Sequence, residues 1–393
     1  MKNKNSRIGF DQWLGVVGGG QLGRMFCQSA QAMGFKVLVL EPDVHAPACQ
    51  LADDVINQPY DNADALDAMA QRCVAVTTEF ENVSAQSFER LARHTRVAPA
   101  ANALDTVQDR ATEKAYIRSL GIPVAPYAVI ESLDDLSKAA PELLADGILK
   151  LSRMGYDGKG QHRIQDLAQA RQAFSEMGER PCVLESRLPL DHEISIVLAR
   201  GLDSQIAVFD AARNVHHDGI LAVTHVDGQQ NEQTHQARDW ACQIAQQMNY
   251  HGVLCVEFFV LQDGSMVVNE IAPRPHNSGH FTQNACVTSQ FEQQARVMAG
   301  LPLGDPRLLA AAVMLNLLGE VWVGESGDQN QEPDWSKILA LPGVALHLYG
   351  KTEARVGRKM GHINITAPDF KEAVRIANVV VETLSLPEKA VFV

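Results

Sequence analysis

Residues 253–271, VLCVEFFVLQDGSMVVNEI, predict a β-hairpin. Two apolar runs flank Asp263-Gly264, a dipeptide typical of a two-residue type I′ turn. Counting back from such a turn places Glu257 directly opposite Glu270. Opposed side chains have Cβ atoms ~5 Å apart, a separation at which like charges repel. Two acids in the middle of such apolar strands therefore need a counter-ion, and the hairpin predicts an acidic site on one face of a sheet.

A hard divalent cation with oxygen ligands would satisfy both acids. Mg²⁺ shared with ATP phosphates is the interpretation we favour for Glu257 and Glu270. The alternative, a pair of half-exposed acids on a wet sheet face, fits poorly with such apolar strands. The same register turns Asn269 to the opposite face, so a role for Asn269 requires a β-bulge or its backbone.

The segment after the hairpin, Ala272–His280 (APRPHNSGH), gathers polar groups on a backbone stiffened by two prolines. Polar side chains held rigidly beside a metal site are typical of a binding site. His276 and His280 also raise the alternative of zinc, but no acidic or thiol partner stands at a zinc-like spacing.

Residues 150–161, KLSRMGYDGKGQ, form a second candidate site, in which a lysine ends an apolar run and a loop with three glycines follows. Glycines let backbone N–H groups approach phosphate oxygens, and Lys150 and Lys159 would neutralise those oxygens. The segment lacks the G-x-x-x-x-G-K-[ST] pattern, so it is not a Walker A loop. A solvated hairpin loop is the alternative, and it explains neither the three glycines nor the lysine.

Gly18–Gly23 follows the apolar run Trp13–Val17 and opens a helical pattern. Backbone N–H groups at a helix N-terminus favour an anion such as phosphate. The G-x-G-x-x-G spacing, with Glu41 at the end of the next apolar run, also matches a dinucleotide fingerprint. A tight turn that only packs a helix against a strand explains the glycines equally well.

A basic cluster lies near the C-terminus at residues 351–362, KTEARVGRKMGH. Four basic groups close together in a chain of net charge −13 suggest a phosphate contact. The alternative is a solvated basic loop.

The composition limits the class of protein. The chain has 393 residues, 46% hydrophobic and 21% charged, which is typical of a globular protein of two or three domains. The acidic net charge argues against a surface that binds nucleic acid. No apolar run reaches the ~20 residues that a membrane helix needs. Seven scattered cysteines without a CxxC pair oppose a disulfide framework and favour a reducing cytoplasm.

The order of patterns predicts an α/β and α+β protein. A flexible extension (1–12) precedes a Rossmann-like domain (13–120), where apolar runs alternate with helical patterns. A small lobe (121–190) and a large lobe with the metal site (191–305) follow. A C-terminal domain (306–393) ends the chain.

Taken together, these motifs resemble the N5-carboxyaminoimidazole ribonucleotide synthetase family of ATP-grasp ligases. The resemblance runs from about Leu14 to the end of the chain. The motifs are GGGQLGRM (18–25), TTEFENV (77–83), KLSRMGYDGKGQ (150–161), HHDGI (216–220), NEIAPRPHNSGH (269–280) and GRKMGH (357–362). The resemblance implies an ATP-grasp fold with a Rossmann-like pre-ATP-grasp domain, central ATP-grasp lobes and a small C-terminal domain that completes the substrate site.

The resemblance also implies a role for each matching residue. ATP would be bound by Arg110, Lys150, Gly155, Tyr156, Asp157, Gly158, Lys159, Gly160, Gln161, Glu185, Ser186, Arg187, Leu188, Glu193, His216, Asn269 and Glu270. The ribonucleotide would be held by Gln21, Leu22, Glu79, Asn277, Lys351, Arg358 and Lys359. Residues at the reacting centre would be Asp157, Arg274, His276, Lys351 and Arg358. Glu257 and Glu270 would carry Mg²⁺, as the hairpin suggests independently.

The implied reaction consumes ATP, bicarbonate and aminoimidazole ribonucleotide, through carboxyphosphate, in purine synthesis. The resemblance further implies a cytoplasmic homodimer without nucleic-acid or membrane partners. Formate-dependent glycinamide ribonucleotide transformylase, or another ATP-grasp carboxylate–amine ligase, is the nearest alternative. A Rossmann oxidoreductase would rest on Gly18–Gly23 alone, and a non-catalytic nucleotide sensor is expected to lose one of the two metal acids.

Overall fold

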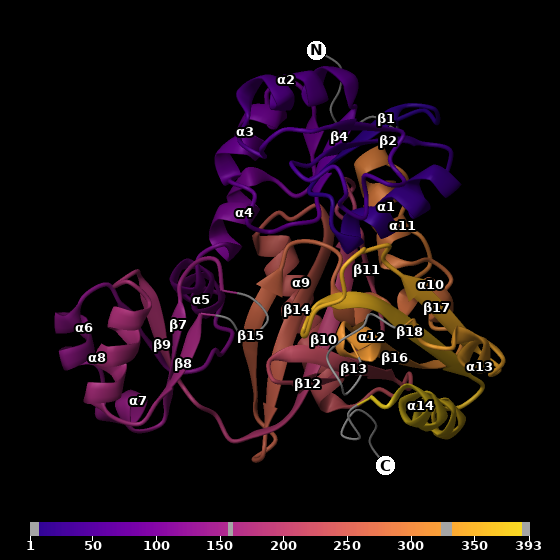
Figure 1. The fold of residues 1–393 in the computed structure, drawn as a ribbon. Coiled ribbons are helices and arrows are strands. Elements are labelled where there is room, and N and C mark those ends of the chain that lie inside the picture. The colour runs from indigo at the N-terminus through magenta and orange to yellow at the C-terminus, as the bar shows by residue number, and fades with distance from the viewer. Residues whose placement is uncertain (1–7, 156–159, 324–331, 387–393) are drawn as a thin grey trace.

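The computed structural model describes residues 8–155, 160–323 and 332–386, which form three β-sheets with surrounding helices (Figure 1). Within those ranges, each helix is too short or too polar to cross a bilayer. The three sheets differ in strand direction, and their arrangement decides where a ligand fits.

The N-terminal sheet is parallel, with strand order β3-β2-β1-β4-β5. Its strands are β1 (Trp13–Val17), β2 (Lys36–Leu40), β3 (Asp54–Ile56), β4 (Ala75–Thr78) and β5 (Arg96–Val97), and the helices of this region are α1 (Gln21–Ala32), α2 (Ala63–Arg72), α3 (Ala85–Ala92) and α4 (Ala101–Val107). The strand order reverses between β1 and β4. In open α/β sheets, ligands bind in the crevice beyond the carboxyl ends of the strands at such a reversal. The loops after β1 and β4 therefore flank a candidate site.

A helix from the second half of the chain, α11 (Gln290–Ala299), packs against α1 and completes the apolar core of this sheet. The side chain of Gln294 is buried between two sheets. Its amide nitrogen donates to Thr77 Oγ1 and the Ala98 carbonyl, both at 3.0 Å, and its oxygen accepts from the backbone N–H of Val253 at 2.6 Å. The N-terminal sheet is thus hydrogen-bonded to the hairpin that carries the two acids.

The small sheet is antiparallel, with order β6-β9-β7-β8, and projects to the left in Figure 1. Its elements are β6 (Tyr127–Ile130), α6 (Leu133–Lys138), α7 (Pro141–Ala145), β7 (Gly147–Leu151), β8 (Gln161–Ile164), α8 (Leu167–Glu176) and β9 (Cys182–Ser186). Helix α5 (Arg110–Ser119) leads into it. The carboxylate of Asp109 caps α5 by accepting from the backbone N–H groups of Ala111 and Thr112, so Arg110 begins the helix.

The large sheet has nine strands, in the order β15-β14-β10-β12-β13-β16-β18-β17 with β11 beside β10. They are β10 (Leu190–Arg200), β11 (Ile206–Val208), β12 (Ala212–His217), β13 (Ile220–Val226), β14 (Gly252–Leu261), β15 (Met266–Ala272), β16 (Ala311–Leu318), β17 (Val344–Leu348) and β18 (Lys359–Ala367). The remaining helices are α9 (Glu232–Gln247), η1 (Asn277–Gly279), α10 (Thr282–Ala285), α12 (Glu320–Val323), α13 (Trp335–Leu339) and α14 (Phe370–Leu384). Because β16 pairs with β13, the C-terminal strands continue the same sheet.

The hairpin of β14 and β15 pairs Glu257 with Glu270, as predicted, but the predicted turn is wrong. Leu261 N–H donates to the Ser265 carbonyl, so the loop is one residue longer, and Gly264 has a φ of +84° whereas Asp263 is not among the residues with positive φ. A type I′ turn requires positive φ at both central residues. A β-bulge next to Glu257 leaves Asn269 without a cross-strand partner and restores the pairing of the two acids. The bulge is the condition under which Asn269 can take part in the site.

Candidate functional site

A cavity of about 830 Å³ opens where the three sheets approach one another. It receives the loops after β1 and β4, the start of α5, strands of the small sheet and one face of the large sheet. Its volume is in the range of ligand-binding pockets. Residues far apart in sequence therefore converge on one space.

Most of the predicted site residues line this cavity. They are Gln21, Leu22, Glu79, Arg110, Lys150, Gly155, Gly160, Gln161, Glu185, Ser186, Arg187, Leu188, Glu193, His216, Glu257, Asn269, Glu270, Arg274, His276, Asn277 and Lys359. Tyr156, Asp157, Gly158 and Lys159 lie outside the described residues. Lys351 and Arg358 are not in the lining: Lys351 Nζ donates to the Lys359 carbonyl at 2.6 Å, and Arg358 donates to the Glu353 carbonyl at 2.7 Å.

One end of the cavity is built around Glu185, which is 3% exposed. Its carboxylate lies 3.0 Å from Lys150 Nζ and 3.2 Å from Lys114 Nζ. Burial opposes ionisation of Glu185, but the attraction of Lys150 and Lys114 outweighs it and lowers its pKa to about 2. Lys150 faces the cavity, whereas Lys114 is sealed behind it. Sequence reasoning missed Lys114, because its partner lies 71 positions away.

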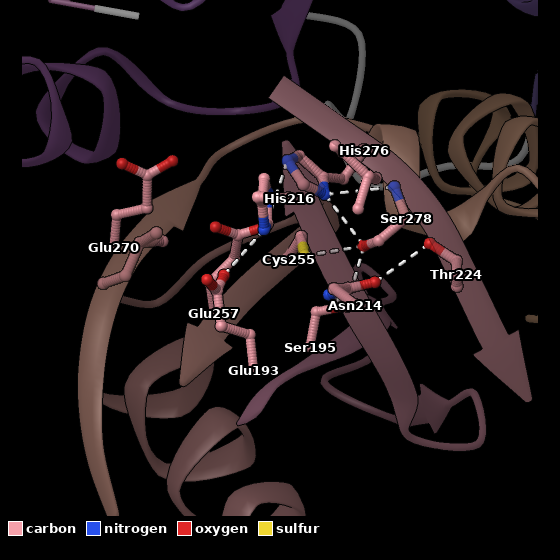
Figure 2. A network of polar contacts seen from close by, with 12 residues as sticks. Glu193, Ser195, Asn214, His216, Thr224, Cys255, Glu257, Glu270, His276 and Ser278 are labelled. Carbon is pink, nitrogen blue, oxygen red and sulfur yellow. Dashed lines mark hydrogen bonds and ion pairs between the residues drawn. The ribbon is translucent and has the colours of Figure 1, made fainter. Parts of the chain in front are cut away.

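The two hairpin acids face this cationic end. Glu270 Oε2 lies 3.3 Å from Arg110 NH1. Glu257, seen in Figure 2, has a buried Oε1 that makes no hydrogen bond to any of the described residues. Burial and the neighbouring Glu270 raise the pKa of Glu257 to about 8, whereas the positive charges of Arg110 and Lys150 outweigh burial and lower the pKa of Glu270. A buried, unpartnered carboxylate oxygen beside a second carboxylate fits a hard cation. The described residues offer no group of three or more His, Cys, Asp or Glu around a metal position.

Glu113 is a further acid at this end that sequence reasoning missed. It is 1% exposed, and its Oε1 accepts from the backbone N–H of Ile271 at 2.6 Å. Burial, followed by the charge of Glu270, raises its pKa to about 8. Its contact holds the end of β15, next to Glu270, against α5.

Glu193 and His216 pair across β10 and β12, with 2.8 Å between Glu193 Oε2 and His216 Nδ1. Burial lowers the pKa of His216, but the contact with Glu193 outweighs it, so the net shift is upward. The pair offers a carboxylate and an imidazole on the cavity wall, suitable for hydroxyl and phosphate oxygens of a nucleotide.

At the other end, carboxylates occupy the backbone donors of the first glycine-rich loop. Glu79, at the end of β4, accepts from Gly20 N–H at 2.7 Å and Gly23 N–H at 3.2 Å. Glu41 accepts from Gly19 N–H at 2.6 Å and from the Tyr60 hydroxyl at 2.5 Å. These contacts argue against a dinucleotide site. The loop amides that would bind a pyrophosphate already donate to Glu79 and Glu41, and Glu41, which would bind a ribose, is itself occupied by these contacts.

The segment after the hairpin adds groups between the two ends. Arg274 Nε donates to Glu81 Oε2 at 2.6 Å, a partner that the sequence did not reveal. Asn277 is 9% exposed and lines the cavity, and neither polar atom of its side chain makes a hydrogen bond within the described part of the chain. Burial, followed by the charge of Arg274, lowers the pKa of His276 well below its usual value. Asn277 and a neutral His276 are thus available to a ligand.

Known protein families match consecutive parts of the chain. The ribonucleotide synthetase preATP-grasp domain matches residues 12–108, and the ATP-grasp domain matches residues 115–291. The phosphoribosylaminoimidazole carboxylase C-terminal domain matches residues 312–375.

Individual proteins match over nearly the whole length. The chain is 42% identical over 358 residues to N5-carboxyaminoimidazole ribonucleotide synthase from Brucella melitensis, which covers 90% of this chain and 96% of that protein. A structure of N5-carboxyaminoimidazole synthetase from Staphylococcus aureus complexed with ADP has a TM-score of 0.88 at 35% identity and covers 96% of this chain and 98% of that one. A structure of the Aspergillus clavatus synthase with ADP and 5-aminoimidazole ribonucleotide has a TM-score of 0.85 at 28% identity, with 97% and 99% covered.

Proposed function

This chain belongs to the N5-carboxyaminoimidazole ribonucleotide synthase family of ATP-grasp ligases, and from this premise we propose where its substrates bind. ATP occupies one end of the cavity and 5-aminoimidazole ribonucleotide occupies the other. The family and the ATP-grasp fold predicted from the sequence are confirmed, and the formate-dependent alternative is not favoured. The activity is ATP-dependent carboxylation of the ribonucleotide. The observation that supports the placement of both substrates is the division of the cavity into a cationic end and an end at the strand-order reversal.

ATP is assigned to the end built around Glu185. In this proposal, Lys150 and Arg110 face the phosphates, Glu185–Leu188 present backbone groups to adenine, and Glu193 with His216 contacts the ribose. Gly155–Gln161 would approach the phosphates from the small sheet. A structure of the Staphylococcus relative with ADP is consistent with nucleotide binding in this fold.

Mg²⁺ is assigned to Glu257 and Glu270, with Asn269 beside them on the bulge. When bound, the ion supplies charge neutralisation for the phosphates. The chain's own part is to hold two carboxylates on one sheet face, with Arg110 and Glu113 fixing the position of Glu270 and of the backbone next to it.

The ribonucleotide is assigned to the end at the carboxyl edges of β1 and β4. Gln21, Leu22, Glu79, Asn277 and Lys359 line it, and Lys351 holds the backbone of Lys359. We place Arg274 and His276 at the reacting centre between the two ends. There, fixed charges and hydrogen-bond donors would stabilise charge that develops as phosphate and carboxyl groups are transferred. Asp157 and Arg358 keep the roles at this centre that the family resemblance implies.

One assay tests this assignment against the alternatives. ADP release is measured with aminoimidazole ribonucleotide plus bicarbonate, and separately with glycinamide ribonucleotide plus formate. The first pair is expected to stimulate release and to yield the N5-carboxylated product. Stimulation by the second pair alone would replace the proposed substrates with those of the formate enzyme.

We also propose a cytoplasmic homodimer. The seven cysteines are all free thiols, as expected in a reducing compartment. Light scattering coupled to size-exclusion chromatography is expected to give twice the chain mass of 42.9 kDa. A monomer mass at micromolar concentration would refute the dimer.

Lys359→Ala is expected to raise the KM for the ribonucleotide about 10- to 150-fold, because a charge-assisted phosphate contact contributes about 1.5–3 kcal/mol. Lys351→Ala and Arg358→Ala are also expected to raise the KM for the ribonucleotide. Lys351 holds the backbone of Lys359, and Arg358 holds the loop before it. The KM for ATP should change little in all three. Lys337→Ala, which removes an exposed lysine of α13, serves as the charge-matched control. An equal effect on both substrates would contradict the assignment.

The carboxyl donor is tested by isotope transfer. If bicarbonate attacks the γ-phosphorus of ATP, carboxyphosphate forms and one bicarbonate oxygen ends in inorganic phosphate. With ¹⁸O-labelled bicarbonate, the phosphate is therefore expected to carry the label in step with ADP formation, as measured by mass spectrometry. Unlabelled phosphate beside normal product would exclude the carboxyphosphate route.

A further inference from the structure

A chain of hydrogen bonds runs beneath the cavity and ends on His276 (Figure 2). Thr224 Oγ1 donates to Asn214 Oδ1 at 2.9 Å, and Asn214 Nδ2 donates to Ser195 Oγ at 2.9 Å. Ser195 Oγ donates to Ser278 Oγ at 2.7 Å, and Ser278 Oγ lies 2.9 Å from His276 Nδ1. We call Thr224, Asn214, Ser195 and Ser278 the polar chain.

The polar chain lies on the sheet face that carries the two acids. Asn214 on β12 is directly opposite Thr224 on β13, and Ser195 on β10 is directly opposite Glu257 on β14. Directly opposed residues point to the same face of a sheet. All four members are at most 5% exposed. Buried hydroxyl and amide groups without a partner cost free energy, so the intact chain is a stable arrangement.

The direction of the chain follows from the donors. An amide nitrogen can only donate, so the Ser195 hydroxyl oxygen accepts from Asn214. The Ser195 hydroxyl then donates its own hydrogen bond to Ser278. The Ser278 hydroxyl has one proton left, which goes to His276 Nδ1. Its other neighbour, Cys255 Sγ, is a weak acceptor at 3.8 Å.

A second donor, at a longer distance, points in the same direction. The backbone N–H of Ser278 also points at His276 Nδ1, at 3.3 Å. A backbone N–H can only donate, so this contact also favours an Nδ1 without a proton, although at 3.3 Å it is weaker than the hydroxyl contact at 2.9 Å. The reversed chain would place an N–H of the ring against this N–H. The ring proton therefore sits on Nε2.

The backbone that carries the ring is also held in place. Gln290, fully buried, accepts from the backbone N–H of His276 at 2.8 Å and donates to its carbonyl at 2.7 Å. Nε2 lies on the cavity side, 3.6 Å from Glu257 Oε1, which is longer than a hydrogen bond. The Nε2 proton thus faces the cavity, where an oxygen of a bound ligand would accept it.

We propose that the polar chain consists of positioning residues that lock His276 as the Nε2–H tautomer, so that it acts at the reacting centre as a hydrogen-bond donor. For the identity of the oxygen that receives this bond, the proposal rests on the proposed function. In the carboxylation, the recipient is an oxygen of the phosphoryl or carboxyl group on which negative charge develops. The tautomer itself follows from the protein alone.

Asn214→Asp tests the lock, because a carboxylate only accepts. Thr224 and Ser195 would both donate to it, Ser278 would donate to Ser195, and Nδ1 would lose its hydroxyl donor. We expect kcat to fall about 10- to 100-fold, by analogy with residues that orient metal-ligating imidazoles, at an unchanged KM for ATP. Thr224→Val removes one hydroxyl at nearly constant shape and is expected to have a smaller effect in the same direction. Thr224→Ser keeps the hydroxyl and should restore near-normal turnover.

The tautomer is read directly by ¹⁵N NMR of histidine-labelled protein without substrates, with the His276 signals identified by their loss in His276→Gln. We expect an unprotonated Nδ1 and a protonated Nε2 in the natural chain. In Asn214→Asp we expect a mixture, because only the longer 3.3 Å contact from the Ser278 backbone N–H would still favour an unprotonated Nδ1. A protonated Nδ1 in the natural chain would overturn the proposal, as would a folded Asn214→Asp with unchanged tautomer and turnover. If Asn214→Asp does not fold, the ¹⁵N spectrum of the natural chain and the turnover of the Thr224 variants still test the proposal. Because this readout needs no substrate, failure of the substrate assignment leaves it unaffected.

Discussion

Glu270→Gln is expected to reduce Mg²⁺-dependent ATP turnover about 10³-fold while the fold stays intact, a loss typical of removing one preorganised charge from a reacting centre. The substitution keeps the shape of the side chain and removes the charge that faces Glu257 and Arg110. Without the charge of Glu270, Glu257 would be the only acid left to bind Mg²⁺ at this position. The measurement is ADP release at saturating substrates, with thermal unfolding as the check on folding.

Glu89→Gln is the matched control, because Glu89 is an exposed acid on α3. It should leave turnover and unfolding unchanged. A Glu270→Gln variant that keeps turnover within about tenfold of the natural chain, a barrier change of only ~1.4 kcal/mol, would contradict the metal assignment.

Lys114→Met and Lys150→Met are expected to separate stability from binding. Both lysines contact Glu185, but only Lys150 lines the cavity. Breaking a fully buried ion pair costs about 3–5 kcal/mol, and Lys114→Met should lower the free energy of unfolding by the lower part of that range because Lys150 remains. Lys150→Met should raise the KM for ATP about 10- to 150-fold through the loss of a charge-assisted contact of about 1.5–3 kcal/mol.

Urea denaturation and the KM for ATP, measured on both variants, test the distinction. The natural chain and Lys138→Met, which removes an exposed lysine of α6, are the references. If the two variants change the same quantity to the same extent, Lys114 and Lys150 share one role and the division of the Glu185 cluster is wrong.

The hairpin illustrates what the sequence could predict. Two apolar runs and an Asp-Gly turn were enough to pair Glu257 with Glu270, yet the turn and the bulge each shift the register by one residue in opposite directions. The correct pair was therefore reached although both intermediate steps were missed. A bulge depends on the twist of the neighbouring strands, which local sequence does not encode.

Other site residues were missed because their partners are distant in the sequence. Glu81 meets Arg274 across 193 positions, and Lys114 meets Glu185 across 71. Neither lysine nor glutamate is unusual on a helix or in a loop, so these contacts are visible only after folding. The polar chain was missed for a similar reason, since Ser195 and Thr224 are ordinary strand residues until β10, β12 and β13 are placed side by side.

Helix α11 has a consequence for how the chain is made. The core of the N-terminal sheet is completed by residues near 295, so the first 120 residues leave the ribosome without the helix that covers them. At 5–20 residues per second, the remaining stretch takes about 10–40 s to synthesise. Nascent chains arrested before residue 290 are therefore expected to be cut by protease within the first sheet and to bind chaperones, whereas chains arrested well beyond α11 are expected to be protected.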